Sequence, residues 1–374
     1  MKVRGVLQRS TRRVLAIAKD MSSVAAAVPH WIARAPRRPS LVLHAGQHKT
    51  GSTSFQAFLS GAPLSLARQG VHVVRAGQSL AGDHHRLILA RRGLRARARH
   101  LLLSAEIARA TNSTLLISSE TATEVILAGG GHGLIDFFRA AGVGQVTLLL
   151  YLRSPVALAN SGYSEVIGGM EHGGPAFPEF LASWNDGAYL HYDRFLELAG
   201  REDVLLEVRP YDARARRGIV HDLASALRLD EPSLAEPRAN GSLGPVALEA
   251  IRTISGELGS MPAALRWRVS ARLRAIGRGL EERPFWGMDA RHRRLVADAE
   301  RRTDAFAHAV WGTGWIERIG DEQRPYNVFD PGRSDQMRMF EATIPLMRAA
   351  AAELTASVRK RRRSRSRAGG TAAR

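Results

Sequence analysis

The residues with the clearest chemical potential lie together in the run Gly46-Gln-His-Lys-Thr-Gly-Ser-Thr-Ser54. Its two glycines allow the backbone to curl, its lysine supplies a cation, and its hydroxyl side chains can donate hydrogen bonds. A short apolar run at residues 41–43 precedes it, and Phe55, Phe58 and Leu59 follow at helical spacing. We therefore expect a strand, a loop and a helix whose first backbone N–H groups bind a phosphate-like anion.

The spacing within this loop distinguishes it from one class of phosphate-binding protein, the kinases and NTPases. Gly46 and Gly51 have the separation of the Walker A pattern of kinases and NTPases, in which a lysine directly follows the second glycine. Here Ser52 occupies that position, and the lysine is Lys49. A kinase or NTPase would also need an acidic Mg²⁺ ligand at a strand end. The displaced lysine argues against this class, which stays as the alternative function.

Three segments resemble the PAPS-dependent sulfotransferases, whose donor is 3′-phosphoadenosine 5′-phosphosulfate. The run from His48 to Ser54 resembles their 5′-phosphosulfate loop, in particular the His-Lys-Thr-Gly-Thr-Thr-Ser form of bacterial and carbohydrate-directed members. Arg153 after an apolar strand, with Ser161 on the following helix, resembles the 3′-phosphate motif. The strand that ends in Tyr211 resembles a later strand whose tyrosine lies near the adenine. The resemblance covers roughly residues 40–215.

This resemblance implies an α/β fold of the P-loop sulfotransferase type, with a central parallel sheet flanked by helices and a helical C-terminal part. It also implies a role for each motif residue. Lys49 would lie at the bridging oxygen, where negative charge grows as the leaving group departs. Arg153 and Ser161 would hold the 3′-phosphate, and Tyr211 would contact the adenine. The 5′-phosphosulfate would contact Thr50, Gly51, Ser52, Thr53 and Ser54.

Transfer to an acceptor hydroxyl also needs a base, and Glu120 is the first candidate. It ends a buried-type strand over residues 113–120, and ligands bind at the carboxyl ends of strands in open α/β sheets. The Ser119-Glu120 pair resembles that of family members that use glutamate. The other interpretation of Glu120 is a carboxylate paired with a loop arginine. The reserve candidates are His84, His85 and His48. No carboxylate or histidine cluster indicates a metal site, and the chemistry needs none.

A carbohydrate or glycolipid is the expected acceptor, because the His-Lys-Thr-Gly form of the loop resembles the carbohydrate-directed branch. Residues 168–190 are rich in Gly, Pro, His and aromatic residues, too irregular for core, and we expect a mobile loop over the acceptor or a plain surface connection. Residues 79–110 are predicted to be helical, with a basic face that is either solvated or a site for an acidic acceptor. The arginines of this face are Arg91, Arg92, Arg95, Arg97 and Arg99.

The net charge of +19 is concentrated at the two ends of the 374-residue chain. Residues 1–38 carry nine Lys/Arg against one acid, and residues 359–374 carry eight against none, which leaves +3 for the body. We therefore divide the chain into a basic N-terminal extension (1–38), a sulfotransferase domain (39–358) and a disordered basic tail (359–374). The tails suit peripheral contact with an anionic membrane, and nucleic acid is not an expected partner. A third alternative is a non-catalytic protein that binds membrane or nucleic acid through its tails.

Composition restricts the location and the chemistry. The chain has no cysteine, which excludes disulfides and cysteine nucleophiles and fits the reducing cytoplasm that we predict as its location, with peripheral contact at the inner membrane face. The apolar runs at residues 14–18 and 24–28 are too short for a signal peptide or a membrane span, so we expect neither.

The remaining pattern predicts an α/β chain followed by helices. Further strands are expected near residues 71–74, 145–152 and 203–212, and the second of these is apolar enough for a central parallel strand. The glycine-rich run 129–133 is expected to be a connection before a helix at 134–141. Residues 230–242 are a predicted linker, and the amphipathic helices from residue 244 onward are expected to flank the sheet.

Overall fold

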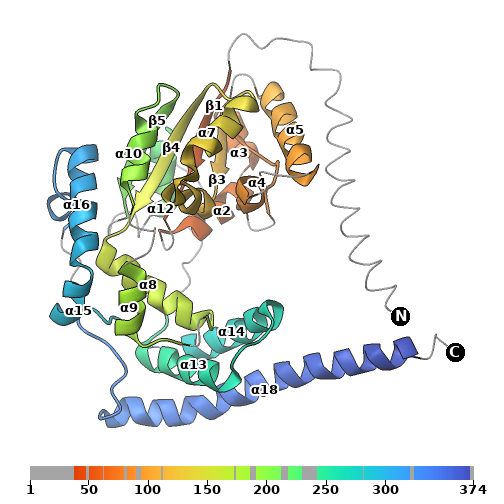
Figure 1. Ribbon diagram of the computed structural model, residues 1–374, viewed down its shortest axis with the longest axis vertical. Coiled ribbons are helices and arrows are strands. Elements are labelled where there is room, and N and C mark those ends of the chain that lie inside the picture. Colours follow the sequence, from red (N-terminus) through yellow and green to blue (C-terminus); the bar gives the residue numbers. More distant parts are fainter. Residues whose placement is uncertain are drawn as a thin grey trace.

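A five-stranded sheet, in which all strands are parallel, forms the centre of the fold in the computed structural model (Figure 1). The strand order is β2-β3-β1-β4-β5, so the chain leaves β1 toward one edge and later returns to its other side at β4. The ligand crevice of such a sheet lies at this reversal, which is beside β1. The strands are β1 (Ser40–His44), β2 (Val71–Val73), β3 (Thr114–Ser118), β4 (Gln145–Leu152) and β5 (Val204–Pro210). The structure describes residues 38–47, 50–61, 63–79, 82–89, 94–110, 113–171, 174–185, 191–211, 218–229, 242–280, 282–320 and 324–370.

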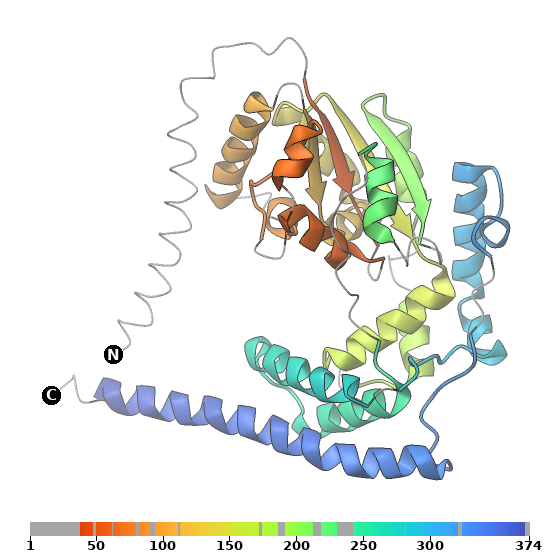
Figure 2. The same cartoon turned by 180° about the vertical axis from the view of Figure 1, so that it is seen from behind.

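Helices cover both faces of this sheet, as Figures 1 and 2 show from opposite sides. Successive strand residues point to opposite faces, so Leu148 and Leu150 enter one apolar core while Leu149 and Tyr151 enter the other. One face is covered by α2 (Ser52–Gly61), α3 (Pro63–Arg68) and α12 (Ile219–Ala226). The other is covered by α5 (Leu94–Arg109), α7 (Gly131–Ala140) and α10 (Asp193–Ala199). Burial on both faces explains why these strands are apolar runs, and the α/β class predicted from the sequence is confirmed.

The segment between β3 and β4 differs from the prediction at its glycines. The expected connection at residues 129–133 is instead part of a nearly continuous helical stretch: α6 (Glu120–Val125), the π-helical turn η2 (Ile126–Gly130) and α7. Gly129 carries the kink, with φ of 81°, a conformation that glycine adopts without a steric penalty. The expected helix therefore begins at Gly131.

The C-terminal helices form a second body beyond the carboxyl edge of the sheet, joined to it through α8 (Pro155–Gly168) (Figure 1). We expected these helices to flank the sheet, but α13, α14 and α18 pack mainly on one another and on α8. The helix α16 lies nearer the sheet, where the indole N–H of Trp311 donates to the Val208 carbonyl of β5 at 3.1 Å. The bounds are α13 (Pro245–Leu258), α14 (Ala263–Arg278), α15 (Ala290–Leu295), α16 (Ala297–Trp311), α17 (Trp315–Ile319) and α18 (Ser334–Gly370).

The segment 168–190 was wrongly predicted to be too irregular for core. Residues 177–185 form α9 (Phe177–Asn185), which buries Phe177, Phe180 and Trp184. Tyr163 of α8 contacts the first two of these aromatic rings at centroid distances of 5.0 and 5.6 Å. Aromatic residues at positions three and four apart share one helix face, so the segment supplies core rather than a loop over an acceptor. Residues 172–173 and 186–190 lie outside the described residues.

The backbone of α18 extends into the basic tail as far as Gly370. The disorder that we expect for residues 359–374 stays a prediction. Extending an existing helix needs no new nucleation, and arginine and alanine favour helix. The N-terminal extension up to residue 37, the linker at residues 230–241 and the last four residues lie outside the described part of the chain. Among the described helices, none has the length and apolar character needed to cross a membrane.

Candidate anion-binding site at the sheet edge

The predicted phosphate-binding loop connects β1 to α2 at the carboxyl edge of the sheet. Gly51 adopts φ of 78°, and a Cβ there would also lie 3.1 Å from Ile219 Cγ1, so this position requires glycine. The backbone N–H groups of Ser54 and Phe55 donate to the Gly51 carbonyl at 3.0 and 3.2 Å, which closes the first turn of α2. The helix begins at Ser52, so its positive end faces the loop. His48, Lys49 and the side chain of Thr53 lie outside the described residues.

Gln47 anchors this loop to β4. Its backbone N–H donates to the Tyr151 carbonyl at 3.3 Å, and its side-chain oxygen accepts from the backbone N–H of Arg153 at 3.1 Å. Its side-chain nitrogen donates to the Tyr192 hydroxyl at 2.6 Å. Burial raises the pKa of Tyr192 to about 12, so this hydroxyl is neutral at neutral pH and can accept the bond. The Thr50 hydroxyl donates to the Gln47 carbonyl at 2.5 Å, which fixes the loop's own turn.

The predicted 3′-phosphate pair is in contact. Arg153 Nη1 donates to Ser161 Oγ at 3.1 Å, which links the residue that follows β4 to a residue of α8. The Arg153 guanidinium also lies over the Tyr211 ring, 5.9 Å from its centroid, and the Tyr211 N–H donates to the Leu152 carbonyl at 2.6 Å. The three side chains are partly exposed. Thus the ends of β4 and β5 and the helix α8 bring the Arg153–Ser161 motif and Tyr211 together.

Glu120 lies beside the loop, as predicted, although it begins α6 rather than ending β3. The Ser52 hydroxyl donates to its carboxylate, a contact between residues far apart in sequence. The start of α6 is held against the loop by Thr123, whose hydroxyl contacts the Ala45 and Gly46 carbonyls at 2.6 and 3.2 Å. The alternative for this residue, a carboxylate paired with a loop arginine, stays a prediction.

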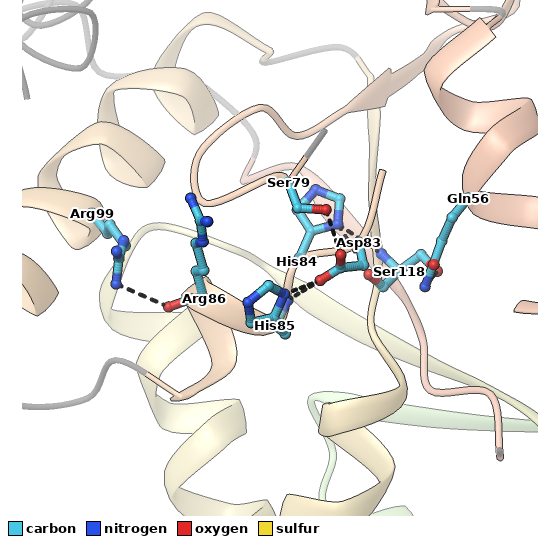
Figure 3. A network of polar contacts seen from close by, with 8 residues as sticks. All are labelled: Gln56, Ser79, Asp83, His84, His85, Arg86, Arg99 and Ser118. Carbon is cyan, nitrogen blue, oxygen red and sulfur yellow. Dashed lines mark hydrogen bonds and ion pairs between the residues drawn. The ribbon is translucent and has the colours of Figure 1, made fainter. Parts of the chain in front are cut away.

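Three buried polar side chains support the loop from below. His44 Nδ1 lies 2.9 Å from Ser118 Oγ, and Gln56 donates to the same hydroxyl at 3.5 Å. His84 donates from Nε2 to the Val74 carbonyl at 2.6 Å and accepts at Nδ1 from the Ser118 N–H at 3.3 Å (Figure 3). Both ring nitrogens of His84 are engaged and its side chain is fully buried, so its proposed reserve role as base is wrong. Its role is to join β2, β3 and α4 (His85–Leu89).

The predicted basic helix at residues 79–110 is two helices, α4 and α5, and residues 82–84 precede them without helical structure. Asp83 contacts both Ser79 and His85, which caps the start of α4 (Figure 3). On the basic face, Arg99 donates to the Arg86 carbonyl at 3.2 Å, and Arg97 is exposed. Arg91, Arg92 and the side chain of Arg95 lie outside the described residues, so the acidic-acceptor hypothesis for this face stays a prediction.

Comparison of the chain with known protein families, curated proteins and solved structures gave no match. The α/β fold and the geometry of the site are therefore the basis for a functional interpretation. Among the described residues, no group of three or more His, Cys, Asp or Glu side chains is arranged to hold a metal ion.

The structure adds two residues that the sequence interpretation missed. Gln47 lies within the motif but was not singled out, because only its contacts with β4 reveal its anchoring role. Tyr192 carries no local signal at all, since it lies 145 residues from Gln47 in the chain. A glutamine inside a phosphate-loop motif was the one available sequence signal for the pair.

A cavity of about 390 Å³ opens beside this site, between the start of α8 and the helices α15 to α17. Its walls include Ser154, Trp315 and Arg301, but neither Glu120 nor any loop residue. Its lining residue Ser154 directly follows Arg153 in the chain, but the cavity is not lined by the loop that connects β1 to α2.

Buried His44 gives the protein a predictable pH dependence. Burial lowers the pKa of His44 to about 3, whereas an unfolded histidine titrates near 6.5. Below about pH 6.5 the unfolded chain binds a proton that the folded protein does not, so this residue lowers the free energy of unfolding as the pH falls from about 6.5 toward 3, by about 1.4 kcal/mol per pH unit. Denaturant unfolding at several pH values should show a shallower decline in His44→Gln than in the wild type. Equal slopes would contradict the assignment.

Proposed function

We propose that this protein transfers a sulfuryl group from PAPS to an acceptor hydroxyl. The observation that carries the proposal is the position of the Arg153–Ser161 pair. Arg153 directly follows β4, Ser161 lies on α8, and β4 pairs with β1, after which the phosphate-binding loop begins. Neighbouring strands lie about 4.8 Å apart. One sheet edge would therefore carry two adjacent elements suited to binding anions, a loop at a helix start and an arginine with a hydroxyl partner.

Two adjacent anion sites suit a donor with two separate anionic ends. The loop amides and hydroxyls of Thr50, Ser52 and Ser54 would receive the 5′-phosphosulfate, because helix N-termini bind such groups. The guanidinium of Arg153 would receive the 3′-phosphate, for which its fork of donors is well suited. Tyr211, which already lies against Arg153, offers a flat apolar face to the adenine. The chemistry of these residues therefore supports PAPS as the proposed sulfate donor.

The chemistry assigned to the chain's own residues is charge stabilisation and proton transfer. The acceptor oxygen bonds to sulfur, the bond from sulfur to the 5′-phosphate oxygen breaks, and the acceptor proton passes to a base. Lys49 would stabilise the charge on the leaving oxygen, a role proposed from the sequence. Glu120, held beside the loop by Ser52, would accept the proton.

One observation supports the alternative function, phosphoryl transfer by a kinase or NTPase. Ser52 and Glu120 form the kind of hydroxyl and carboxylate pair that can hold Mg²⁺ next to a phosphate loop. The lysine that this class needs at position 52 is absent, however, and a triphosphate leaves the Arg153–Ser161 pair without an explanation. The balance favours sulfuryl transfer.

Calorimetry separates the two functions directly. We expect 3′-phosphoadenosine 5′-phosphate to bind without a divalent ion and more tightly than ATP with Mg²⁺. Magnesium-dependent ATP binding that is tighter would overturn the proposal. Transfer of labelled sulfate from PAPS should then be measured against glycans, glycolipids and phenols. A carbohydrate or glycolipid is the proposed acceptor, and the cytoplasmic face of the membrane is the proposed location.

A tail deletion tests the third alternative, a binding protein that acts through its basic ends. Removing residues 359–374 should leave labelled-sulfate transfer within about twofold of the full chain, because the proposed site lies at the sheet edge. Two results together would favour the binding protein. The deletion would remove all measurable function, and the full chain would also fail to bind the sulfate donor.

Arg153 is expected to govern donor affinity. A charged hydrogen bond contributes about 1.5–3 kcal/mol, so Arg153→Ala should raise the Kd for 3′-phosphoadenosine 5′-phosphate about 10- to 100-fold with a small effect on kcat. Ser161→Ala, which removes the partner hydroxyl but keeps the guanidinium, should raise it less. Arg194→Ala is the matched control, because this arginine is exposed on α10 and pairs with Glu197. An unchanged Kd in Arg153→Ala would contradict the 3′-phosphate assignment.

A further inference from the structure

A basic surface on the C-terminal helices has no role in the proposed site. The helix α14 carries five arginines and no acidic residue, and its Trp267 is 69% exposed. None of these arginines forms an ion pair with another residue in the part of the chain that the structure describes. The arginines are Arg266, Arg268, Arg272, Arg274 and Arg278.

This surface continues onto α18. A groove of about 260 Å³ lies between the two helices, with Trp267, Arg268 and Arg272 on one side and Ala350 and Leu354 on the other. Glu353 is the acidic residue in its lining. The basic end of α18 begins at Arg359, five residues beyond Leu354, which is about 7.5 Å along the helix. The groove therefore lies next to the start of this basic run.

The C-terminal part of α18 extends past the helices that pack against it. Figures 1 and 2 both show α18 passing along α13 and α14 and then continuing away from the rest of the protein. Its residues 359–370 include seven Lys/Arg and no acid.

We propose that α14, together with the groove between α14 and α18, forms a docking surface for an anionic lipid bilayer. Arginines near such a bilayer are attracted by its surface potential, and their long apolar stems can lie along the interface. The exposed indole of Trp267 favours a bilayer over nucleic acid, because tryptophan concentrates at the boundary between headgroups and hydrocarbon. Ala271 and Ala350 line the groove together with Trp267, and their small side chains do not fill it. This surface is independent of sulfuryl transfer.

Vesicle co-sedimentation of the full chain tests the proposal, with phosphatidylcholine alone or mixed with phosphatidylglycerol. Binding is expected to the anionic vesicles only and to weaken with salt. The variant Arg268→Glu/Arg272→Glu should lower the partition coefficient more than about tenfold, since each basic residue near the surface contributes about fivefold. The control Arg291→Glu/Arg294→Glu makes the same charge change on exposed positions of α15 and should stay within about twofold.

Fluorescence quenching by brominated phosphatidylglycerol places Trp267 in the interface. Quenching is expected in the wild type and should be reduced in Trp267→Phe, which keeps an aromatic ring at an exposed position and leaves the fold intact. Circular dichroism of each variant establishes that it is folded. Equal vesicle binding by the α14 and α15 charge variants would overturn the proposal, as would binding to duplex nucleic acid with none to anionic vesicles. Neither measurement depends on enzymatic activity.

Discussion

Replacing Lys49 with alanine is expected to lower the kcat of sulfuryl transfer by about 10²- to 10³-fold. The reason is that a fixed cation at the bridging oxygen interacts more strongly with the developing negative charge than with the bound donor. Labelled-sulfate transfer at saturating PAPS measures kcat, and calorimetry with 3′-phosphoadenosine 5′-phosphate measures donor affinity. We expect the affinity to fall only modestly.

The control for Lys49 is Lys49→Arg, which keeps the charge and changes its shape and reach. Partial activity in this variant, with near-complete loss in Lys49→Ala, would assign the effect to charge at that position. A kcat in Lys49→Ala within a few-fold of the wild type would contradict the role of the lysine. The proposal of sulfuryl transfer would survive that result if donor binding still depended on Arg153.

The second large effect is expected for Glu120→Gln. General-base catalysis contributes about 10²- to 10⁴-fold, so losing the carboxylate should reduce kcat by at least about 10²-fold. Glutamine has the same shape and keeps an oxygen that can accept from the Ser52 hydroxyl, so the loop should stay in place. Donor affinity, measured with 3′-phosphoadenosine 5′-phosphate, should therefore change little.

Two companion variants separate catalysis from loop positioning at Glu120. Ser52→Ala removes the hydroxyl that contacts the carboxylate but leaves the carboxylate itself, so it should affect donor affinity more than Glu120→Gln does. Glu124→Gln, an exposed carboxylate on the same helix, should behave as the wild type. If Glu120→Gln turned over normally, the base would have to be His85 or His48, because buried His84 is unavailable.

The local elements of the fold were predictable because each has a short-range cause. The apolar runs that became β1, β3 and β4 need burial on both faces, and only a parallel sheet covered by helices supplies it. The turn before α2 was predictable from Gly51, which adopts a left-handed conformation there. The helix α9 was missed because the glycine and proline residues before Phe177 favoured an irregular loop. The aromatic face of this helix is recognised only from its packing against Tyr163.

By itself, the sequence determined the class of the fold and the order of strand, loop and helix around Gly51, because short-range periodicity and chain connectivity suffice for these. The pairing of Arg153 with Ser161 was expected from the resemblance to the sulfotransferase 3′-phosphate motif. Only the tertiary structure decided that Gln47 joins the loop to β4, that Ser52 meets Glu120, that His84 is a structural residue, and that α14 lies beside α18. These contacts join residues distant in the chain, so they follow from the order and register of the strands and from which helix faces are buried together, and no local pattern encodes them.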